Sequence, residues 1–436
     1  MKERSVSFYT LGCRLNQSET AAIEQDFKIG GYKIVDFNEP ADMVVINTCT
    51  VTEGGDADTR RLINKAARAN PAARIALIGC QAQVQKEAIS DHPNVSWVIG
   101  NARKMDLKSI IEELDRRDTP YSTRTRKHVI TPAIERGSFT QKNAGIDEHR
   151  TRANLKIQDG CDFFCSFCEI PYARGRARSR EFQDIIKEAE ILVRAGHKEI
   201  VLTGINIGTY RHMGHGLMDV LKALEDIPAL ERTRISSIEP TTIPHGLIEK
   251  MGQKSKLCPY LHIPLQSANN DVLSAMKRKY SFEEFLDLVQ MARDRVACLC
   301  IGTDVIVGFP GETEAHFRQT EERLRTSPID YFHVFSYSER TKAKSRELPE
   351  KVGQAAVNER SRILRELSQR KRLNFYRRLI GSVQRVLFEE TKDGLNSGLC
   401  DNYARVFIEH DGDLVNRLRS VKVEALTNGK LTGRLC

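Results

Sequence analysis

Short apolar runs alternate with helical segments along most of this chain, and that alternation limits its fold more than any other feature. The first series fills roughly the first 115 residues, where β-rich runs occur at 5–13, 43–49, 74–80 and 95–100. Segments of helical periodicity lie between these runs. Strands that alternate with helices form mainly parallel sheets that are covered on both faces. We therefore expect an N-terminal parallel α/β domain over residues 1–117.

A second alternating series follows and contains six β/α units over roughly 225 residues. Its β-rich runs lie at 153–161, 198–204, 232–240, 260–267, 299–311 and 331–338. A closed barrel of eight such units needs about 250 residues. The series therefore predicts an open, partial (β/α)6 barrel, which we assign to residues 147–375.

Two further segments differ from these series. Residues 118–146 are polar, basic and without periodicity, which predicts a linker or a loop laid over the surface. After the second series, short strands are separated by Gly, Asn and Asp, as in a small antiparallel β-barrel. Barrels of this type commonly bind nucleic acids. The predicted fold is thus α/β, with a C-terminal antiparallel barrel at residues 376–436.

The composition is ordinary for a globular protein, with 40% hydrophobic and 29% charged residues. The N-terminus is too charged for a signal peptide, and no window approaches the roughly 18 apolar residues of a membrane span. These features predict a cytoplasmic protein without a membrane partner, and we expect a monomer by default. In a reducing cytoplasm, the eleven cysteines favour metal binding, catalysis or burial over disulfides.

The net charge of +9 is concentrated in one segment. Residues 355–380 carry eight Arg or Lys and two Glu, within a pattern that predicts a helix. Localised positive charge favours an anionic partner, whereas a solvated helix face is the alternative.

Cys161, Cys165 and Cys168 form a C-x3-C-x2-C motif directly after the first strand of the second series. Such a loop can hold three thiolates around a compact soft-metal centre. A closed zinc site needs a fourth Cys or His nearby, and His149 is the only one within twenty residues on either side. A [4Fe-4S] cluster can use three cysteines and keep one iron open for a reactant. The spacing favours this cluster over zinc or structural cysteines.

Cys13, Cys49 and Cys80 each stand at the end of a strand in the N-terminal series, 36 and 31 residues apart. Successive parallel strands end at one edge of a sheet, where ligands of open α/β sheets bind. Three thiols at equivalent places predict a second cluster with an open iron, and independent buried thiols are the alternative. We expect structural or incidental roles for the other five cysteines: Cys258, Cys298, Cys300, Cys400 and Cys436.

These motifs resemble those of the radical S-adenosylmethionine (SAM) methylthiotransferases over essentially the whole chain. The triplet after a barrel strand is similar to the radical SAM signature, and LGCRLNQSE, NTCTVT and GCQAQ resemble the methylthiotransferase domain. The C-terminal barrel resembles a TRAM domain, an RNA-binding module.

The resemblance is closest to the bacterial branch that acts on N6-threonylcarbamoyladenosine in tRNA. It rests on the segments IQDGCDFFCSFCEIPYARGRARSR, RISSIEP, LHIPLQS and TDVIVGFPGET. Arg14 in place of a usual Lys, and SANN at 267–270 in place of SGSD, are departures that bear on the substrate and leave the cluster ligands intact.

The resemblance implies roles for individual residues. Cys161, Cys165 and Cys168 would hold the cluster whose open iron chelates SAM, and the N-terminal cysteines would hold an auxiliary [4Fe-4S] cluster. SAM contacts would come from the C-terminal ends of barrel strands, where barrel active sites form. The implied contacts are Thr203, Gly204, Asn206, Ser236, Glu239, Gln266, Asp304, Val305 and Gly308. The GFPG segment could equally be only a turn.

The resemblance also implies a reaction. Reductive cleavage of SAM would give a 5′-deoxyadenosyl radical, which takes hydrogen from C2 of the adenine at position 37 in a tRNA anticodon loop. A sulfur on the auxiliary cluster, methylated by a second SAM, would then be transferred. An electron donor such as flavodoxin or ferredoxin and a sulfur donor are the implied partners. Such chemistry needs no catalytic His, so we expect His262, on an apolar strand, to be a packed core histidine.

Two other functions stay open. The same chemistry could act on isopentenyl-adenosine in tRNA or on an aspartate of a small-subunit ribosomal protein. A non-catalytic iron–sulfur RNA-binding redox sensor, a different class, would have fully ligated clusters and no need of SAM.

RNA contacts are expected from basic residues near the cluster loop and in the basic helix. Four arginines alternate in ARGRARSR and would face one side of an extended segment, toward phosphates or toward solvent. The expected contacts are Arg174, Arg176, Arg178, Arg180, Arg370, Lys371, Arg372, Arg377 and Arg378. Tyr172, Tyr403 or Phe375 could stack on a base, although aromatic residues of strands and helices more often pack in the core.

Overall fold

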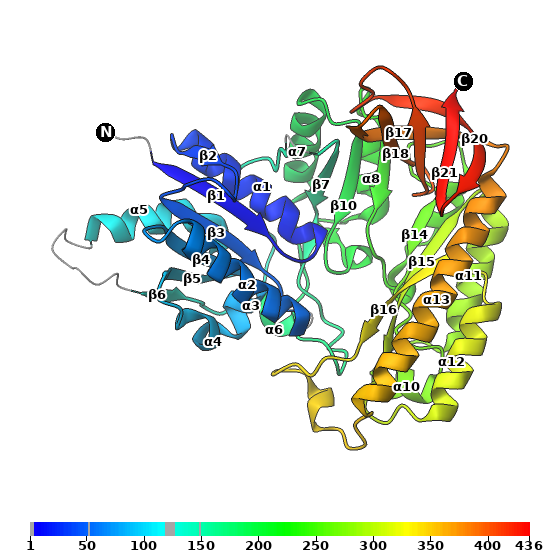
Figure 1. Ribbon diagram of the computed structural model, residues 1–436, viewed down its shortest axis with the longest axis horizontal. Coiled ribbons are helices and arrows are strands. Elements are labelled where there is room, and N and C mark those ends of the chain that lie inside the picture. Colours follow the sequence, from blue (N-terminus) through cyan, green and yellow to red (C-terminus); the bar gives the residue numbers. More distant parts are fainter. Residues whose placement is uncertain (1–3, 51–52, 118–126, 148–149) are drawn as a thin grey trace.

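Six parallel strands build the N-terminal sheet in the computed structural model, which describes residues 4–50, 53–117, 127–147 and 150–436 (Figure 1). The spatial order is β2-β1-β3-β4-β5-β6, so the strand order reverses between β1 and β3. The strands are β1 (Ser5–Thr10), β2 (Lys33–Val35), β3 (Met43–Thr48), β4 (Arg74–Gly79), β5 (Val95–Gly100) and β6 (His128–Ile130). In doubly wound sheets, ligands bind beyond the carboxyl ends of the strands at such a reversal.

Helices cover both faces of this sheet, as the sequence predicts. Val45 of β3 packs with α1 and α5 on one face, whereas its neighbours Val44 and Ile46 pack with α2, α3 and α4 on the other. Every residue of β3 is buried, which explains its continuous apolar run. The helices are α1 (Arg14–Ile29), α2 (Glu53–Ala69), α3 (Cys80–Val84), α4 (Lys86–Ser90) and α5 (Leu107–Arg117), which follows the short 3-10 helix η1 (Lys104–Asp106).

The segment expected as a linker, 118–146, contributes to this domain. Residues 118–126 lie outside the described residues, and β6 then adds an edge strand to the sheet. The remainder is laid across α1 and α7: Lys142 Nζ lies 2.9 Å from Asp26 Oδ1, and the backbone N–H of Gly145 donates to Glu188 Oε1 at 2.7 Å.

Six further parallel strands form the predicted partial barrel. Two three-stranded sheets, β7-β10-β13 and β14-β15-β16, are joined through a bridge between Ser237 and His262. The strands therefore follow one another in space as they do in sequence. They are β7 (Arg152–Lys156), β10 (Glu199–Thr203), β13 (Arg232–Ile235), β14 (Tyr260–His262), β15 (Cys300–Val307) and β16 (Tyr331–Ser336).

Helices pack on the outer face of the half barrel. The capping box of Ser281 and Glu284 fixes the start of α11. These helices are α7 (Phe182–Arg194), α8 (Leu217–Glu225), α9 (Leu247–Gly252), α10 (Asn270–Ala275), α11 (Phe282–Arg295), α12 (Glu314–Thr326) and α13 (Gln354–Leu379). The short helix α6 (Ile170–Arg174) instead contacts α3 of the N-terminal domain. Short two-stranded pairs are formed by β8 (Gln158–Asp159) with β9 (Arg178–Ser179) and by β11 (Arg211–His212) with β12 (His215–Gly216). Brief 3-10 turns occur at η2 (Ile207–Thr209), η3 (Pro240–Thr242) and η4 (Lys344–Glu347).

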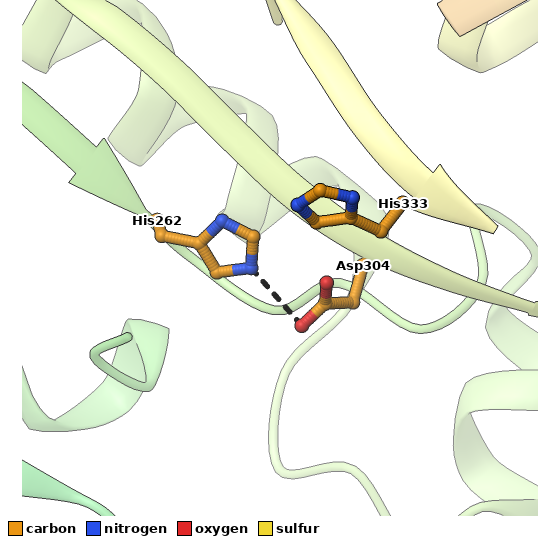
Figure 2. Close-up of side chains that lie close together, drawn as sticks. All are labelled: His262, Asp304 and His333. Atoms are coloured by element: carbon orange, nitrogen blue, oxygen red, sulfur yellow. Dashed lines mark ion pairs between the residues drawn. The ribbon is translucent and has the colours of Figure 1, made fainter. Parts of the chain in front are cut away.

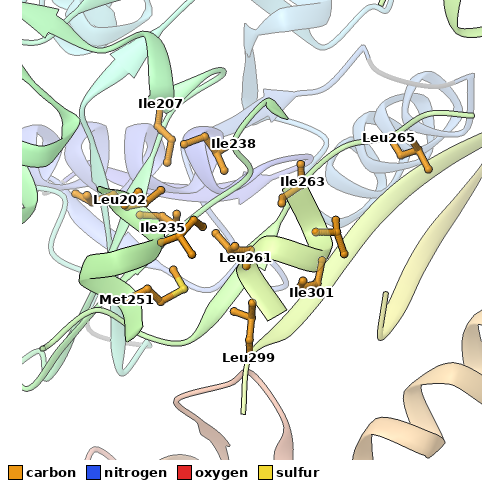
Figure 3. Packing of buried hydrophobic residues seen from close by; sticks show 14 of the residues in the cluster. Leu202, Ile207, Ile235, Ile238, Met251, Leu261, Ile263, Leu265, Leu299 and Ile301 are labelled. Carbon is orange, nitrogen blue, oxygen red and sulfur yellow. The ribbon is translucent and has the colours of Figure 1, made fainter. Parts of the chain in front are cut away.

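The main core lies between these strands and the helices outside them (Figure 3). Leu261 and Ile301 come from adjacent strands and point into this core, near Met251 of α9. Side chains alternate along a strand, so their neighbours Tyr260 and His262 point the other way, into the open side of the half barrel. That open side is lined by a mixture of polar and apolar residues.

A closed five-stranded barrel follows, which confirms the predicted C-terminal module. Its order is β17-β18-β19-β21-β20, with one departure from prediction: the β19–β21 pair is parallel. The strands are β17 (Val383–Lys392), β18 (Leu395–Cys400), β19 (Arg405–Glu409), β20 (Leu418–Thr427) and β21 (Lys430–Leu435). Helix α13 extends into this module, since its Phe375 and Leu379 belong to the barrel core. Among the described residues, no helix is both long and apolar enough to cross a membrane.

Candidate active site

A cavity of about 840 Å³ runs along the polar side of the half barrel. Its walls come from all three parts of the chain: Cys13 from the N-terminal domain, the cysteine triplet after β7, and Tyr403 from the C-terminal barrel. The triplet lies at the carboxyl ends of the strands, whereas Tyr260 and Tyr331, which begin β14 and β16, line the opposite end.

Each sulfur of the cysteine triplet accepts an N–H. The backbone N–H groups of Phe163 and Ile170 donate to the Sγ atoms of Cys161 and Cys168 at 3.5 Å and 3.4 Å. Arg278 Nη1 donates to Cys165 Sγ at 3.3 Å.

These hydrogen-bond donors favour the deprotonated thiolate form of the cysteines, whereas burial favours the neutral thiol form. Burial raises the pKa of Cys161 to about 11, and it also raises the pKa of Cys165 and Cys168. A bound metal centre would resolve the conflict by supplying positive charge to all three sulfurs. The loop therefore fits a [4Fe-4S] cluster with three protein ligands. His149, considered as a fourth zinc ligand, lies outside the described residues.

The loop begins where only glycine fits. Gly160 has φ +69°, and a Cβ there would lie 2.0 Å from the carbonyl oxygen of Arg176. The close approach of these two backbone segments, next to the β8–β9 pair, gives the cysteine loop its base.

Most of the expected SAM contacts lie in the cavity wall. Those that line the cavity with the triplet are Thr203, Gly204, Asn206, Ser236, Glu239, Gln266 and Asp304. Asn206 Nδ2 and Ser236 Oγ are buried and have no hydrogen-bond partner among the described residues. Because both residues line the cavity, these atoms are available to polar groups of a ligand bound there.

Val305 and Gly308 do not line the cavity. Val305 points into the main core, because it alternates with Asp304 along β15. Gly308 has φ +79°, and a Cβ there would lie 2.5 Å from Val357 Cγ2 of α13. The GFPG segment thus serves as a turn that packs on α13.

Arg278 is a site residue that sequence reasoning missed. Besides Cys165, its guanidinium contacts the carboxylate of Glu239 and the hydroxyl of Tyr280. Burial raises the pKa of Glu239, and the charge of Arg278 opposes that rise. Arg278 stands between Lys277 and Lys279 in KRKY, so no local pattern distinguishes it from its neighbours.

The N-terminal cysteines follow β1, β3 and β4, which are neighbours in the sheet. Gly12, with φ +88°, leaves no room for a side chain, since a Cβ would lie 2.8 Å from Cys49 Sγ. Cys80 Sγ accepts hydrogen bonds from Arg174 Nε at 3.2 Å and from Asn101 Nδ2 at 3.6 Å. Cys13 is the member of this set that lines the cavity.

Arg174 belongs to a buried charge network that joins the first two domains. Glu19 of α1, with no solvent exposure, accepts from Lys104 Nζ at 2.5 Å, Lys156 Nζ at 2.6 Å and Arg174 Nη2 at 3.0 Å. Arg174 and Lys156 also bind Asp159. Although burial would raise the pKa of Glu19, these cations hold it well below its usual range. The positive excess beside Cys80 suits an anionic iron–sulfur cluster.

The arginines of ARGRARSR do not share one face, which corrects the expectation for an extended segment. Helix α6 ends at Arg174, and Arg174 and Arg180 are only 0% and 1% exposed. Arg180 contacts Asp184 and Glu188. Arg174 binds the distant Glu19, and Arg180 binds two carboxylates of the helix that follows it. Both arginines are buried in these contacts and are unavailable to RNA phosphates. Arg176 is exposed, and Arg178 is half-buried against Asp159.

The basic residues of α13 divide in a similar way. Arg370, Arg372 and Arg377 are all exposed, and of these three Arg372 also lines the cavity. Lys371 Nζ donates to the carbonyl oxygens of residues 325 and 327 at 3.1 Å and 2.8 Å, and Arg378 pairs with Asp330. Lys371 and Arg378 therefore hold α13 against the end of α12.

The three aromatic residues considered for base stacking differ in their accessibility. Phe375 is buried in the barrel core, whereas Tyr172 is 40% exposed. Tyr403 lines the cavity, but one face of its ring is stacked on Tyr260, with ring centroids 4.5 Å apart.

His262 is buried, as expected, yet it faces the cavity and not the apolar core. Figure 2 shows it beside Asp304 and His333, and His262 Nε2 lies 3.0 Å from Asp304 Oδ2. The three side chains offer metal-ligand atoms within 4.8 Å of one another. Burial lowers the pKa of His333, and the charge of Asp304 opposes that change.

A partial barrel with a three-cysteine loop at its carboxyl end and a ligand cavity beneath it defines a radical SAM enzyme. The family model Radical SAM superfamily matches residues 155–324, and Uncharacterized protein family UPF0004 matches residues 5–100.

A relative from Aquifex aeolicus (strain VF5), named Threonylcarbamoyladenosine tRNA methylthiotransferase MtaB, is 38% identical over 91% of this chain and 95% of its own. A relative from Rickettsia conorii (strain ATCC VR-613 / Malish 7), named tRNA-2-methylthio-N(6)-dimethylallyladenosine synthase, is 30% identical over 98% of each chain. The chain belongs to the family of radical SAM tRNA methylthiotransferases, which work with [4Fe-4S] clusters and SAM.

One solved structure shares the fold at low identity. It is the radical S-adenosylmethionine methyltransferase TsrM from Kitasatospora setae with cobalamin and a [4Fe-4S] cluster bound. The TM-score is 0.56 at 15% identity, over 91% of this chain and 77% of that one.

Proposed function

We propose that this enzyme transfers a methylthio group to C2 of N6-threonylcarbamoyladenosine at position 37 of tRNA, giving the 2-methylthio derivative. The choice of this substrate rests on the order of sequence identity among the relatives. The relative named for threonylcarbamoyladenosine is 38% identical to this chain, against 30% for the one named for dimethylallyladenosine. The tRNA anticodon loop is then the partner that the cavity receives.

The cysteine triplet would hold the radical SAM cluster at the carboxyl end of the cavity. Bound there, the cluster and SAM supply the radical chemistry that no side chain of the protein offers. The chain's own residues bind and orient. The unpartnered Asn206 Nδ2 and Ser236 Oγ would meet polar atoms of SAM. Arg278 would keep Cys165 and Glu239 in place through its contacts with both.

We also propose SAM contacts for the remaining expected residues that line the cavity. Thr203, Gly204, Gln266 and Asp304 all face the space beside the triplet. The C-terminal barrel contributes Tyr403 to the same wall, which helps to exclude water from the reacting atoms.

Cys13, Cys49 and Cys80 would hold the auxiliary [4Fe-4S] cluster that carries the transferred sulfur, and two SAM molecules would be used for each product. Cys13 is the member that reaches the cavity, so the sulfur would be presented from its side. An electron donor such as flavodoxin or ferredoxin and a sulfur donor complete the proposed partners. We expect the enzyme to act as a monomer in the cytoplasm.

RNA phosphates would be bound by the exposed basic residues. Arg176 near the cluster loop, and Arg370 and Arg377 on α13, meet that condition. They lie beside the cavity-lining segments, where an anticodon stem would rest if its loop enters the cavity.

Nucleoside mass spectrometry on tRNA from cells that lack this gene tests the substrate. We expect the methylthio group to vanish from threonylcarbamoyladenosine and to return when the gene is restored. If the methylthio group is lost instead from the dimethylallyl nucleoside or from a ribosomal-protein aspartate, the proposed substrate is wrong, although the enzyme is still a methylthiotransferase. An iron–sulfur redox sensor would leave every methylthio group in place, and its reduced form would not cleave SAM.

A further inference from the structure

Three tyrosines form a row at the end of the cavity that lies away from the cysteine triplet. The Tyr403 ring stacks on Tyr260, and the Tyr260 hydroxyl lies 2.6 Å from the Tyr331 hydroxyl. An arginine stands at each end of the row. Arg14 Nη2 donates to the Tyr403 hydroxyl at 2.7 Å, and the Arg372 guanidinium lies 4.7 Å from the centre of the Tyr331 ring.

These two arginines differ from the other cations of the cavity wall. Arg278 contacts Glu239, while Arg152 and Arg405 both bind Glu389 at 2.6 Å. Within the part of the chain that the structure describes, neither Arg14 nor Arg372 contacts a carboxylate.

Neither acidic side chain of the wall pairs with them, since Glu239 contacts Arg278 and Asp304 contacts His262. This end of the cavity, the Arg14–Arg372 end, therefore holds two guanidiniums that no carboxylate of the described wall contacts. Such a site favours an anionic ligand group.

The contact with Tyr331 also orients one of the two guanidiniums. A cation held against a ring face keeps its N–H fork in a fixed direction. A planar guanidinium binds a carboxylate through two parallel hydrogen bonds, which gives both strength and geometric selectivity. The room for Tyr331 comes from Gly302, where a Cβ would lie 2.4 Å from the ring.

The two candidate nucleosides differ in the feature that this end would recognise. A threonylcarbamoyl group on N6 ends in a carboxylate, whereas a dimethylallyl group is an uncharged hydrocarbon. The target C2 must lie toward the cysteines, so the rest of the nucleoside extends along the cavity toward the tyrosine row.

We propose that Arg372 binds the carboxylate of the N6-threonylcarbamoyl group and thereby selects this nucleoside, while Arg14, at the other end of the tyrosine row, adds positive charge to the same wall. The inference rests on the proposed function and adds the residues that determine specificity. Arg372 is exposed like Arg370 and Arg377, but it differs from them in lining the cavity. The other two would meet backbone phosphates and carry no information on the modification.

Binding of three anticodon stem-loop RNAs to the reconstituted holoenzyme tests the proposal. The RNAs carry threonylcarbamoyladenosine, its carboxyl methyl ester or unmodified adenosine at position 37. We expect the wild-type protein to bind the free acid roughly 10-fold more tightly than the ester, as a charge-assisted pair predicts. In Arg372→Gln the acid and ester should bind equally, with affinity for the unmodified RNA unchanged.

Arg365→Gln is the matched control, because Arg365 is an exposed arginine two helical turns earlier on α13 and does not line the cavity. This variant should show the same ratio of affinities for the free acid and the ester as the wild type. Arg372→Lys, which keeps the charge and loses the fork, should keep part of that ratio. Unchanged binding of the unmodified RNA shows that each variant is folded.

Three results would overturn the inference and leave the proposed function standing. These are equal binding of acid and ester by the wild type, an unchanged ratio in Arg372→Gln, and an equal loss of affinity for all three RNAs, which would make Arg372 a phosphate ligand. The proposed function itself is tested by a separate experiment, which identifies the nucleoside that loses its methylthio group in cells lacking the gene.

Discussion

Glu19 holds three buried cations together, so its charge should matter more to stability than that of any surface carboxylate. The substitution Glu19→Gln keeps the size of the side chain and removes its charge. Lys104, Lys156 and Arg174 are 1%, 8% and 0% exposed. Lys156 and Arg174 would then share Asp159, whereas Lys104 would lose the carboxylate that it contacts in the described structure.

Breaking a buried ion pair by removing one partner costs about 3–5 kcal/mol. We expect the free energy of unfolding at pH 7 to fall by about that amount in Glu19→Gln. Glu24→Gln is the matched control on the same helix, because Glu24 is 25% exposed in a partly solvated pair with Lys28 at 3.4 Å. That pair should contribute no more than about 1 kcal/mol.

The assay is equilibrium urea unfolding of the holoprotein, with both variants brought to equal iron content. The cations lower the pKa of Glu19 in the folded state, so the stabilisation is fully present above the unfolded pKa of about 4.3 and is lost as pH falls below it. The difference between wild type and Glu19→Gln should therefore be constant from pH 7 to about 5.5 and shrink in stronger acid.

A double variant isolates the cause. Lys104→Met added to Glu19→Gln removes one unmatched cation and should restore part of the lost stability. The reasoning is refuted if Glu19→Gln and Glu24→Gln unfold at the same urea concentration, or if the second substitution makes the protein less stable still.

The proposed division between the two cysteine sets gives further predictions. Cys165→Ala should lower iron content by about one cluster and abolish SAM cleavage, measured as 5′-deoxyadenosine release from the reduced protein. Cys49→Ala should keep SAM cleavage and lose methylthio transfer, and equal loss of both activities would contradict separate roles. Arg278→Met removes a hydrogen bond and a positive charge from Cys165, so an electron paramagnetic resonance titration should give a more negative cluster potential, by roughly 60 mV for about 1.5 kcal/mol. An unchanged potential would mean that Arg278 acts on Glu239 alone.

The order of the main strands was predictable because local patterns determine it. Alternating strands and helices with short connections leave few arrangements, and both parallel sheets follow from that rule. The short edge strands β2 and β6 escaped prediction, since three residues carry too little periodicity to be seen. The parallel β19–β21 pair also depends on the closure of the barrel, which no local pattern records.

Site residues could be predicted where their spacing in the sequence indicates a chemical role. They could not be predicted where their role depends on an ion pair with a residue far away in the sequence. The triplet could be found because its three ligands lie within eight residues. Arg174 could not be distinguished from Arg176, because its burial depends on Glu19, 155 positions away. The alternation of Tyr260, His262 and Asp304 on the cavity side was visible as polar residues within apolar strands. Reading those residues as a binding surface required knowing which side of the half barrel stays open.

The shared construction of the cavity ties its enclosure to the last strands of the chain. Cys161, Cys165 and Cys168 line the cavity together with Tyr403 and Arg405, which come from the C-terminal barrel. The cavity wall is therefore complete only when the C-terminal barrel has folded against the half barrel. Until then, the cysteine loop and the strand ends beside it face solvent on the side that Tyr403 and Arg405 later cover.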